Sequence, residues 1–313
     1  MASVESAALI IPTLNAAKHL DRLLPALAGQ IDPARIWVVD SSSTDGTGGR
    51  FQQFGANVHI IAQRDFNHGA TRKMAAGLCP GAEYLIYLTQ DAIPASAASF
   101  ATLLRAFDDP NVGMAYGRQL PRPGARGIEA HSRLAHYTPV SEVRSLSDRQ
   151  RLGIKTPFCS NSFAAYRRSA LEAVGNFPDD AYFAEDQFVS ARMLLAGWKL
   201  AYVADAQVHH SHDYSIAQDF RRYFDIGVFH SHNPWFLKTF GRPEGEGVRT
   251  VQAELRYLRR HEPLSIPSAI TRTAAKYAAY HLGLIQHRLP NALKAQLGMH
   301  GIYWQRRPAK LAD

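Results

Sequence analysis

The chain has 313 residues, of which 46% are hydrophobic and 20% charged, a composition typical of globular proteins that excludes a disordered chain. No apolar run approaches the roughly 18 residues that a membrane-spanning helix needs. The formal charge of +8 is compatible with a nucleic acid, an anionic membrane face or a polyphosphate substrate as partner. Only Cys79 and Cys159 are present, far apart, which indicates reduced thiols rather than a metal pair.

The first third alternates strand and helix patterns. Apolar β runs predict strands over residues 7–12, 35–39, 57–62 and 84–88. The first of these follows Glu5 and is cut by Pro12, which indicates a strand rather than a signal peptide and therefore a cytoplasmic chain. Leucines at 20, 23, 24 and 27 share one helix face, and further helices are expected over 44–54, 69–78 and 97–107. This alternation predicts βαβ units and a mainly parallel sheet.

The later segments are less regular. Residues 121–156 begin with Pro and Gly and read as an insertion, followed by helices over 169–174 and 183–198 and a strand over 199–204. After about residue 215 the pattern is helical, with loops around 242–247 and 263–267. We therefore expect one domain over 1–215, in halves 1–120 and 121–215, and a helical region over 216–313.

Polar side chains follow four successive apolar runs: Asn15, Asp40, Asp65 and Asp91. In open α/β sheets the carboxyl ends of the strands form the ligand crevice, so these positions predict a binding site there. Two common nucleotide signatures are absent. Phe51 stands where G-x-G-x-x-G would need a third glycine, and no G-x-x-x-x-G-K-[ST] loop occurs.

Six ordered segments resemble family 2 of the glycosyltransferases, which have the GT-A fold. They are IIPTLN (10–15), VVDSSSTDGT (38–47), DFNHGATRKMAAG (65–77), YLTQDA (87–92), FAEDQF (183–188) and VHHSHDYS (208–215). Within this family, FNHGATR and TQDA are similar to bacterial rhamnosyltransferases of O-antigen and polysaccharide assembly. The resemblance implies a Rossmann-like α/β GT-A domain with nucleotide-sugar binding in 1–120, acceptor binding and catalysis in 121–215, and a helical C-terminal extension.

The resemblance also implies a set of donor-binding residues. Asp40 would accept the N3–H of a pyrimidine, Gly69 would let backbone approach the nucleotide, and Arg72 would counter diphosphate charge unless it is a surface helix residue. Asp45 would lie near the ribose or serve as a turn or helix cap. The full set is Pro12, Thr13, Asn15, Asp40, Ser42, Asp45, Asn67, Gly69, Arg72, Gln90 and Asp91.

A divalent cation, Mg²⁺ or Mn²⁺, is implied at the fourth segment. Asp91 matches the last residue of the family's D-x-D, while Thr89 replaces its first Asp, so Asp91 alone would make a poor site for a hard cation. A histidine after residue 208 would complete the site. His210 and His212 both fit, and His209 is expected to point the other way.

The fifth segment supplies the catalytic groups. Sugar hydroxyls are very weak acids, and the resemblance makes Asp186 the general base with Glu185 in a supporting role. Both carboxylates would also favour the start of a helix. Upstream, Ser160 and Asn161 would hydrogen-bond sugar hydroxyls or hold ordinary turns.

Together these features imply an inverting, metal-dependent transferase that moves L-rhamnose from dTDP-β-L-rhamnose to a saccharide or polyprenyl-linked acceptor. A helix over 270–284, with Tyr277, Tyr280 and Leu284 near Arg272 and Lys276, would rest on the inner membrane surface or pack on the catalytic domain. The alternatives are a UDP-hexose or UDP-N-acetylhexosamine donor and a non-catalytic nucleotide-sugar-binding protein. Nucleic acid is not an expected partner, because no recognition helix or RNA-binding motif is present.

Overall fold

The structure, a computed structural model, describes residues 2–306, so residues 307–313 of the predicted helical region lie outside the described part. The chain forms two compact units. The first comprises Met1–Pro123, His136–Ala181 and Glu185–Ser211, and the second comprises Gly124–Ala135, Tyr182–Ala184 and His212–Asp313. The expected boundary at 215 differs from this division, because two short segments from the middle of the chain belong with the C-terminal helices.

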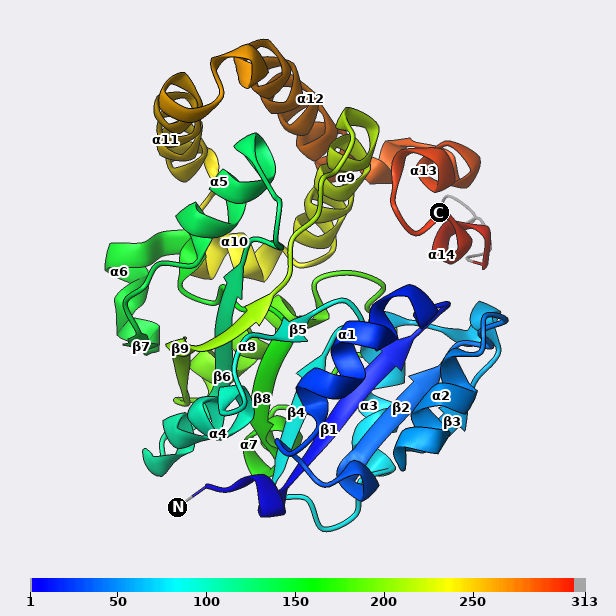
Figure 1. Cartoon of the computed structure of the whole chain (residues 1–313). Helices are drawn as coiled ribbons and strands as arrows, with labels where there is room; N and C mark the ends of the chain where they lie inside the picture. The colour runs from blue at the N-terminus through cyan, green and yellow to red at the C-terminus, as the bar shows by residue number, and fades with distance from the viewer. Residues whose placement is uncertain (1, 307–313) are drawn as a thin grey trace, which may run out of the picture. The chain divides into compact units, whose positions relative to one another are not determined.

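The first unit is built on one nine-stranded sheet with the order β3-β2-β1-β4-β8-β6-β9-β5, and β7 pairs with β9 (Figure 1). The strands are β1 Ala7–Thr13, β2 Ile36–Asp40, β3 Asn57–Ile60, β4 Tyr84–Leu88, β5 Ile93–Pro94, β6 Val112–Leu120, β7 Glu142–Arg144, β8 Phe163–Arg167 and β9 Lys199–His209. The four strands predicted in the first third are present, within one or two residues of their expected ends.

The sheet is mixed rather than mainly parallel. β1 pairs in parallel with β2 and β4, and β2 with β3, as the βαβ pattern predicts. β8 lies antiparallel between β4 and β6, while β6 and β9 run parallel. β6 and β8 are not predicted as strands from the sequence. Two glycines, Gly113 and Gly117, lie within β6, two of the five residues of β8 are alanine, and both residue types are depleted in strands.

Helices cover both faces of the sheet. On one face Leu9 and Ile11 of β1 share a core with α1, α2 and α4. On the other face Tyr87 of β4 packs edge-on against Tyr166 and Phe177, and its hydroxyl donates to the Arg72 carbonyl of α3 at 3.0 Å. The α-helices of this unit are α1 Ala17–Leu27, α2 Thr47–Phe54, α3 His68–Gly77, α4 Ser99–Leu104, α6 Arg149–Leu152, α7 Arg168–Ala173 and α8 Glu185–Leu195.

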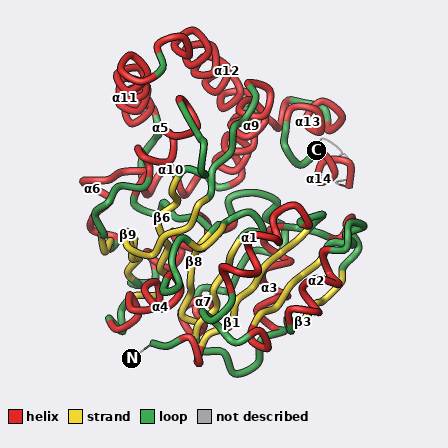
Figure 2. The backbone as a smooth tube through the Cα atoms, viewed as in Figure 1, coloured by secondary structure: helices red, strands yellow, loops and turns green. Residues whose placement is uncertain are grey.

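The described residues of the second unit form helices and loops without strands (Figure 2). Its helices are α5 Gly127–His136, α9 Ile216–His232, α10 Pro234–Phe240, α11 Glu244–His261, α12 Ile266–Leu284, α13 Asn291–Leu297 and α14 Gly301–Arg306. The loop expected over 242–247 is wrong from residue 244 onward, because α11 begins there. Within residues 2–306, none of the helices has the length and apolarity of a membrane span.

Two glycines allow α9 and α12 to cross closely. A Cβ on Gly227 would lie 2.2 Å from the Tyr280 carbonyl oxygen, and a Cβ on Gly283 would lie 2.2 Å from the Phe224 carbonyl oxygen. Both distances are far below van der Waals contact, so any larger residue forces the two helix backbones apart. The helix pair that forms the core of this unit therefore depends on glycine at both positions.

We predict that Gly283→Ala lowers the free energy of unfolding by about 1–3 kcal/mol, because the added methyl overpacks the crossing. Gly245→Ala in α11 is the matched control, since nothing lies within 4 Å of its added Cβ. That change should be neutral or slightly stabilising, because alanine is the better helix former. Denaturant unfolding followed by circular dichroism measures both, and equal effects of the two substitutions would contradict the close crossing.

Candidate active site

The topology gathers the predicted polar residues at one edge of the sheet. β1, β2 and β4 run parallel, so Thr13, Asp40 and Asp91 lie at or just beyond their carboxyl ends. β8 runs antiparallel to β4, so the loop that precedes it, with Ser160 and Asn161, reaches the same edge. Antiparallel pairing thus brings a segment from the middle of the chain to the crevice that the parallel strands form.

Asp40 is held by hydrogen bonds from Thr13 of β1 and from Ser43 of its own loop. Its Oδ1 accepts from the hydroxyls of Thr13 at 2.8 Å and Ser43 at 2.5 Å, and its Oδ2 accepts from the Ser43 amide at 2.9 Å. The side chain is 3% exposed. A carboxylate offers about four lone-pair directions, so most of this acceptor capacity is used within the protein. The carboxylate is therefore fixed in place by the turn that follows β2.

The β1–α1 and β2–α2 loops are joined to each other. Asn15 accepts at Oδ1 from the Thr44 amide at 3.0 Å and donates its own amide to Ser43 Oγ at 2.8 Å. Asp45 accepts from the Ala17 amide at 2.9 Å and from Thr47, and these bonds lower the pKa of its carboxyl. Asp45 therefore accepts hydrogen bonds from the first amides of α1 and α2, which are the contacts expected of a helix cap.

Two residues of this edge have left-handed backbone. Asn15 has φ 49° and Ser42 has φ 59°, and the side chains of both are exposed. The Ser42 hydroxyl donates to the Ile61 carbonyl at 2.8 Å. Such conformations cost free energy and concentrate at functional sites. Pro12, which precedes Thr13 in β1, is partly buried at the same edge.

Gly69 and Asn67 have structural contacts at the start of α3. Asn67 caps the helix, since its Oδ1 accepts from the amides of Gly69 and Ala70. A Cβ on Gly69 would lie 2.0 Å from the Pro178 carbonyl oxygen. The glycine is therefore required by the approach of the loop before α8.

Arg72 faces Glu185. Its Nη1 lies 3.3 Å from Glu185 Oε1, and both side chains are buried, with 4% and 5% of each residue exposed. Nη1 also donates to the His68 carbonyl at 3.0 Å. This burial corrects the alternative of a surface helix residue for Arg72 and shows that its charge is opposed by a carboxylate within the protein.

Asn161 connects the two acidic residues at the start of α8. Its backbone amide donates to Asp186 Oδ2 at 3.1 Å, and its side-chain amide donates to Glu185 Oε1 at 2.9 Å. The Tyr166 hydroxyl donates to Asn161 Oδ1 at 2.6 Å and fixes the amide orientation. Asn161 is 3% exposed, and its side chain is held by these two bonds.

The neighbours of the two carboxylates shift their pKa values in opposite directions. Burial acts to raise the pKa of Glu185, but the positive charges of Arg72 and His68 and the bond from Asn161 lower it overall. Burial and the adjacent Glu185 charge raise the pKa of Asp186 to about 6. The lowered pKa of Glu185 favours its anion, whereas the raised pKa of Asp186 favours retention of a proton on a side chain that is partly exposed.

Asp91, His210 and His212 form a group of metal-ligand type. Their candidate ligand atoms lie within 4.8 Å of one another, and Asp91 Oδ2 is 3.5 Å from His210 Nε2. His212 follows Ser211, the last residue of the first unit. His209 Nδ1 lies 3.0 Å from the Pro121 carbonyl and is not in the group. One carboxylate and two imidazoles suit a divalent transition ion such as Mn²⁺.

The residues beside Asp91 have different roles. Gln90 clamps the end of β1, because its Oε1 accepts from the Leu14 amide at 2.8 Å and its Nε2 donates to the Leu14 carbonyl at 3.1 Å. The Thr89 hydroxyl is buried and has no hydrogen-bond partner among the described residues. Gln90 therefore shapes the loop around Asp91, and Thr89 leaves a polar group available beside it.

Sequence reasoning missed Gln119 and Tyr166. Gln119 is 2% exposed and lies 2.9 Å from His210 Nδ1 through its Oε1, and Tyr166 holds Asn161 as described above. The sequence does contain a pattern that points to Gln119. This residue follows the apolar run 112–116, just as Asp40 and Asp91 follow apolar runs of their own. It was overlooked because β6 was not predicted as a strand.

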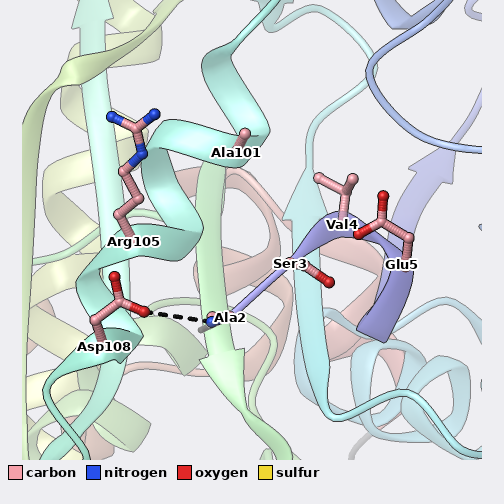
Figure 3. Close-up of a pocket in the computed structure, with 7 residues that line it drawn as sticks. All are labelled: Ala2, Ser3, Val4, Glu5, Ala101, Arg105 and Asp108. Atoms are coloured by element: carbon pink, nitrogen blue, oxygen red, sulfur yellow. Dashed lines mark hydrogen bonds between the residues drawn. The ribbon is translucent and has the colours of Figure 1, made fainter.

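A surface hollow at the opposite edge of the sheet contains none of the predicted site residues (Figure 3). Residues 2–5, which precede β1, line it together with Ala101, Arg105 and Asp108. The Ala2 amide donates to Asp108 Oδ1 at 3.3 Å. The hollow adjoins the amino end of β1, whereas ligands of open α/β sheets bind at carboxyl ends. It is therefore not the candidate active site.

Comparison with known proteins agrees with this geometry. The profile described as Glycosyl transferase family 2 matches residues 8–175. The chain is 42% identical over 298 residues to the O-antigen chain rhamnosyltransferase WbaN of Salmonella anatum, covering 95% of each chain. It is also 42% identical over 299 residues to RfbN of Salmonella typhimurium, again with 95% of each covered, and RfbN carries the same description.

Solved structures show the same fold. The mannosyltransferase PcManGT from Pyrobaculum calidifontis, in complex with GDP-Man and Mn²⁺, has a TM-score of 0.55 and 20% identity, covering 97% of this chain and 87% of its own. Residues 1–349 of TarS from S. aureus give a TM-score of 0.53 and 16% identity, with 90% and 91% covered. With its GT-A fold, its family match and its two relatives of nearly full length, the chain belongs to glycosyltransferase family 2 and is a glycosyltransferase.

Proposed function

We propose that this enzyme transfers L-rhamnose from dTDP-β-L-rhamnose, with inversion at the anomeric carbon, to a hydroxyl of a bacterial cell-surface saccharide or lipid-linked acceptor. The observation that carries the donor and acceptor class is the 42% identity, over 95% of the chain, to two proteins named O-antigen chain rhamnosyltransferase. The acidic pair at the start of α8 supports a direct displacement, because it provides one base and one fixed anion.

Asp186 is the proposed general base. A carboxylate that is fully ionised and well solvated is a weak base, whereas the pKa of about 6 makes Asp186 a better acceptor for a hydroxyl proton. Bonds from the Asn161 and Gln187 amides hold its two oxygens at 3.1 and 2.8 Å, which fixes its direction. Glu185 is the proposed support, because it neutralises Arg72 and raises the pKa of Asp186.

Asp91, His210 and His212 are the proposed ligands of Mg²⁺ or Mn²⁺. Oxygen and imidazole nitrogen ligands together suit Mn²⁺ better than Mg²⁺, which prefers oxygen alone. When bound, such a cation neutralises the charge that develops on a leaving diphosphate. The edge loops with Pro12, Thr13, Asn15, Asp40, Ser42 and Asp45 are proposed to hold the nucleoside, with Gln90 shaping the loop after β1. Asn67, Gly69 and Arg72, at the start of α3, are also proposed to contribute to donor binding.

We predict that the protein binds dTDP-rhamnose more tightly than UDP-glucose, UDP-N-acetylglucosamine or GDP-mannose, and more tightly with Mn²⁺ than with EDTA. Calorimetry measures each pair.

Asp186→Asn should keep donor binding and lower transfer by about 10²–10⁴-fold, because only the proton acceptor is lost. Preference for a UDP-sugar would overturn the donor assignment, and unchanged transfer by Asp186→Asn would overturn the role of the base.

We predict a rising limb near pH 6 in the pH profile of kcat/KM. Burial raises the pKa of Asp186 to about 6. The carboxylate form, which is the active base, therefore predominates above about pH 6 and is lost as the pH falls below about 6. Glu185→Gln should move this limb to lower pH, since it removes the adjacent negative charge. Glu172→Gln on α7 is the control, and it should leave the limb in place. An unmoved limb in Glu185→Gln would contradict the coupling.

We further propose that the second unit contacts an anionic membrane surface. Leu264 is 93% exposed between α11 and α12, and Ile270 and Tyr277, 56% and 65% exposed, lie seven residues apart on one face of α12. Exposed Arg256, Arg259 and Arg260 end the preceding helix. Apolar side chains beside arginines are the composition of a membrane-surface helix.

The exposed stripe differs from the one expected from the sequence. Tyr280 is buried, with its hydroxyl 3.0 Å from His230 Nδ1 of α9. Arg272 and Lys276 pair with Asp219 of α9 at 2.8 and 3.6 Å, so they are not available to a lipid surface. The face of α12 that carries these residues packs within the second unit, and the opposite face carries the proposed contact.

We predict that the protein co-sediments with vesicles containing anionic phospholipid and not with neutral vesicles. The variant with Leu264→Ser, Ile270→Ser and Tyr277→Ser should lose most of this binding, because the apolar contact is removed while the arginines stay. Val140→Ser is the matched control in the first unit, since Val140 is 69% exposed. Undiminished vesicle binding by the triple variant would contradict the proposed membrane contact.

A further inference from the structure

A bulge between β6 and β9 determines which side chains of the two strands lie on the same face of the sheet near their carboxyl ends. Gly117 pairs with Val203, but the next residue, Arg118, pairs with Gln207, so β9 contains three extra residues. Side chains alternate along strands, and an odd insertion reverses which face each later residue of β9 occupies relative to β6. A Cβ on Gly117 would lie 2.3 Å from Phe163 and 2.5 Å from the Ala206 carbonyl, so the bulge requires glycine there.

This phase brings Gln119 against His210. Gln119 pairs in register with Val208, and the His210 amide donates to the Leu120 carbonyl at 3.0 Å. The Gln119 side chain is 2% exposed, and its Oε1 lies 2.9 Å from His210 Nδ1. An amide oxygen is an acceptor only, so this contact requires a proton on Nδ1. His210 Nε2 is the ring nitrogen that faces Asp91, at 3.5 Å from its Oδ2.

The other end of the same amide holds the loop of the catalytic base. Gln119 Nε2 donates to Ser160 Oγ at 2.9 Å, and the Ser162 amide donates to the same oxygen at 3.3 Å. Asn161, between these serines, donates its backbone amide to Asp186 Oδ2. Hydrogen bonds thus run from His210 through Gln119 to Ser160, and the next residue along the chain, Asn161, bonds the Asp186 carboxylate.

We infer that Gln119 is a positioning residue that selects the Nδ1–H tautomer of His210 and joins the metal group to the loop that holds Asp186. The inference rests on the proposed metal site at Asp91, His210 and His212. Groups that bond the second nitrogen of a ligating histidine fix its ring orientation, and their loss typically lowers metal affinity by about 10–100-fold. Gln119 is not a catalytic residue in this account, because it acts only through His210 and Ser160.

We predict that Gln119→Met weakens Mn²⁺ binding to the whole chain by about 10–100-fold, as measured by the electron paramagnetic resonance of free Mn²⁺. Gln119→Glu keeps an acceptor opposite Nδ1 and should bind within a few-fold of the parent protein. Gln30→Met is the matched control, since Gln30 is a buried glutamine whose bonds to Ala26 and Phe100 lie away from the site. It should leave Mn²⁺ affinity unchanged.

Two further variants separate the possible failures. Asp91→Asn and His210→Ala should lose Mn²⁺ binding. If they do and Gln119→Met binds as the parent does, the role of Gln119 is overturned while the metal site stands. If both bind Mn²⁺ normally, the proposed metal site itself is overturned, and this inference with it.

A measurement on the unaltered sequence tests the tautomer directly. In ¹⁵N-histidine-labelled, metal-free protein, the His210 signals, assigned by their loss in His210→Ala, should show a protonated Nδ1. A purely structural role for Gln119 would not require this tautomer. A protonated Nε2 with a bare Nδ1 would overturn the inference regardless of how any Gln119 variant folds.

Discussion

The arrangement of the acidic residues at the start of α8 depends on a buried ion pair. The Arg72 guanidinium stabilises the charged form of Glu185 rather than that of its neighbour Asp186. Glu185 and Asp186 are adjacent at the start of α8, and two anions in a medium of low polarity repel strongly. Arg72, at 3.3 Å, stabilises Glu185 as the anion and leaves Asp186 with the raised pKa. Removing one member of a buried pair typically costs about 3–5 kcal/mol, because the remaining charge is left without a partner.

Several features of the first unit follow from this pair. Gly69 lets the loop before α8 approach α3, since the Pro178 carbonyl occupies the space of a Cβ, and this approach brings Arg72 and Glu185 together. Asn161 bonds both carboxylates and is itself held by Tyr166 of β8. The residues around the acidic pair therefore orient Asp186, and the charge of Glu185 contributes to its raised pKa.

The second constraint is the direction of β8. Had this strand run parallel to β4, the loop with Ser160 and Asn161 would lie at the opposite edge, far from Asp91. Its antiparallel pairing places the loop beside the carboxyl ends of β4 and β6, where Gln119 bonds Ser160. The bulge in β9 then turns His210 toward Gln119. Asp91, His210 and the acidic pair of α8 thus lie at one edge through two departures from a regular parallel sheet.

The sequence by itself determined the first four strands, the helices between them, the family and the acidic, histidine and loop segments of the site. These features are local, because hydrophobic period and short ordered motifs are encoded within a few neighbouring residues. Only the tertiary structure decided that Arg72 opposes Glu185, that Asn161 bonds both carboxylates, that Gln119 bonds His210, and that Tyr280 rather than Tyr277 is buried. Each of these contacts depends on which distant segments pack together, on the direction of a strand or on a bulge. The spacing of residues that are close in sequence does not encode these features.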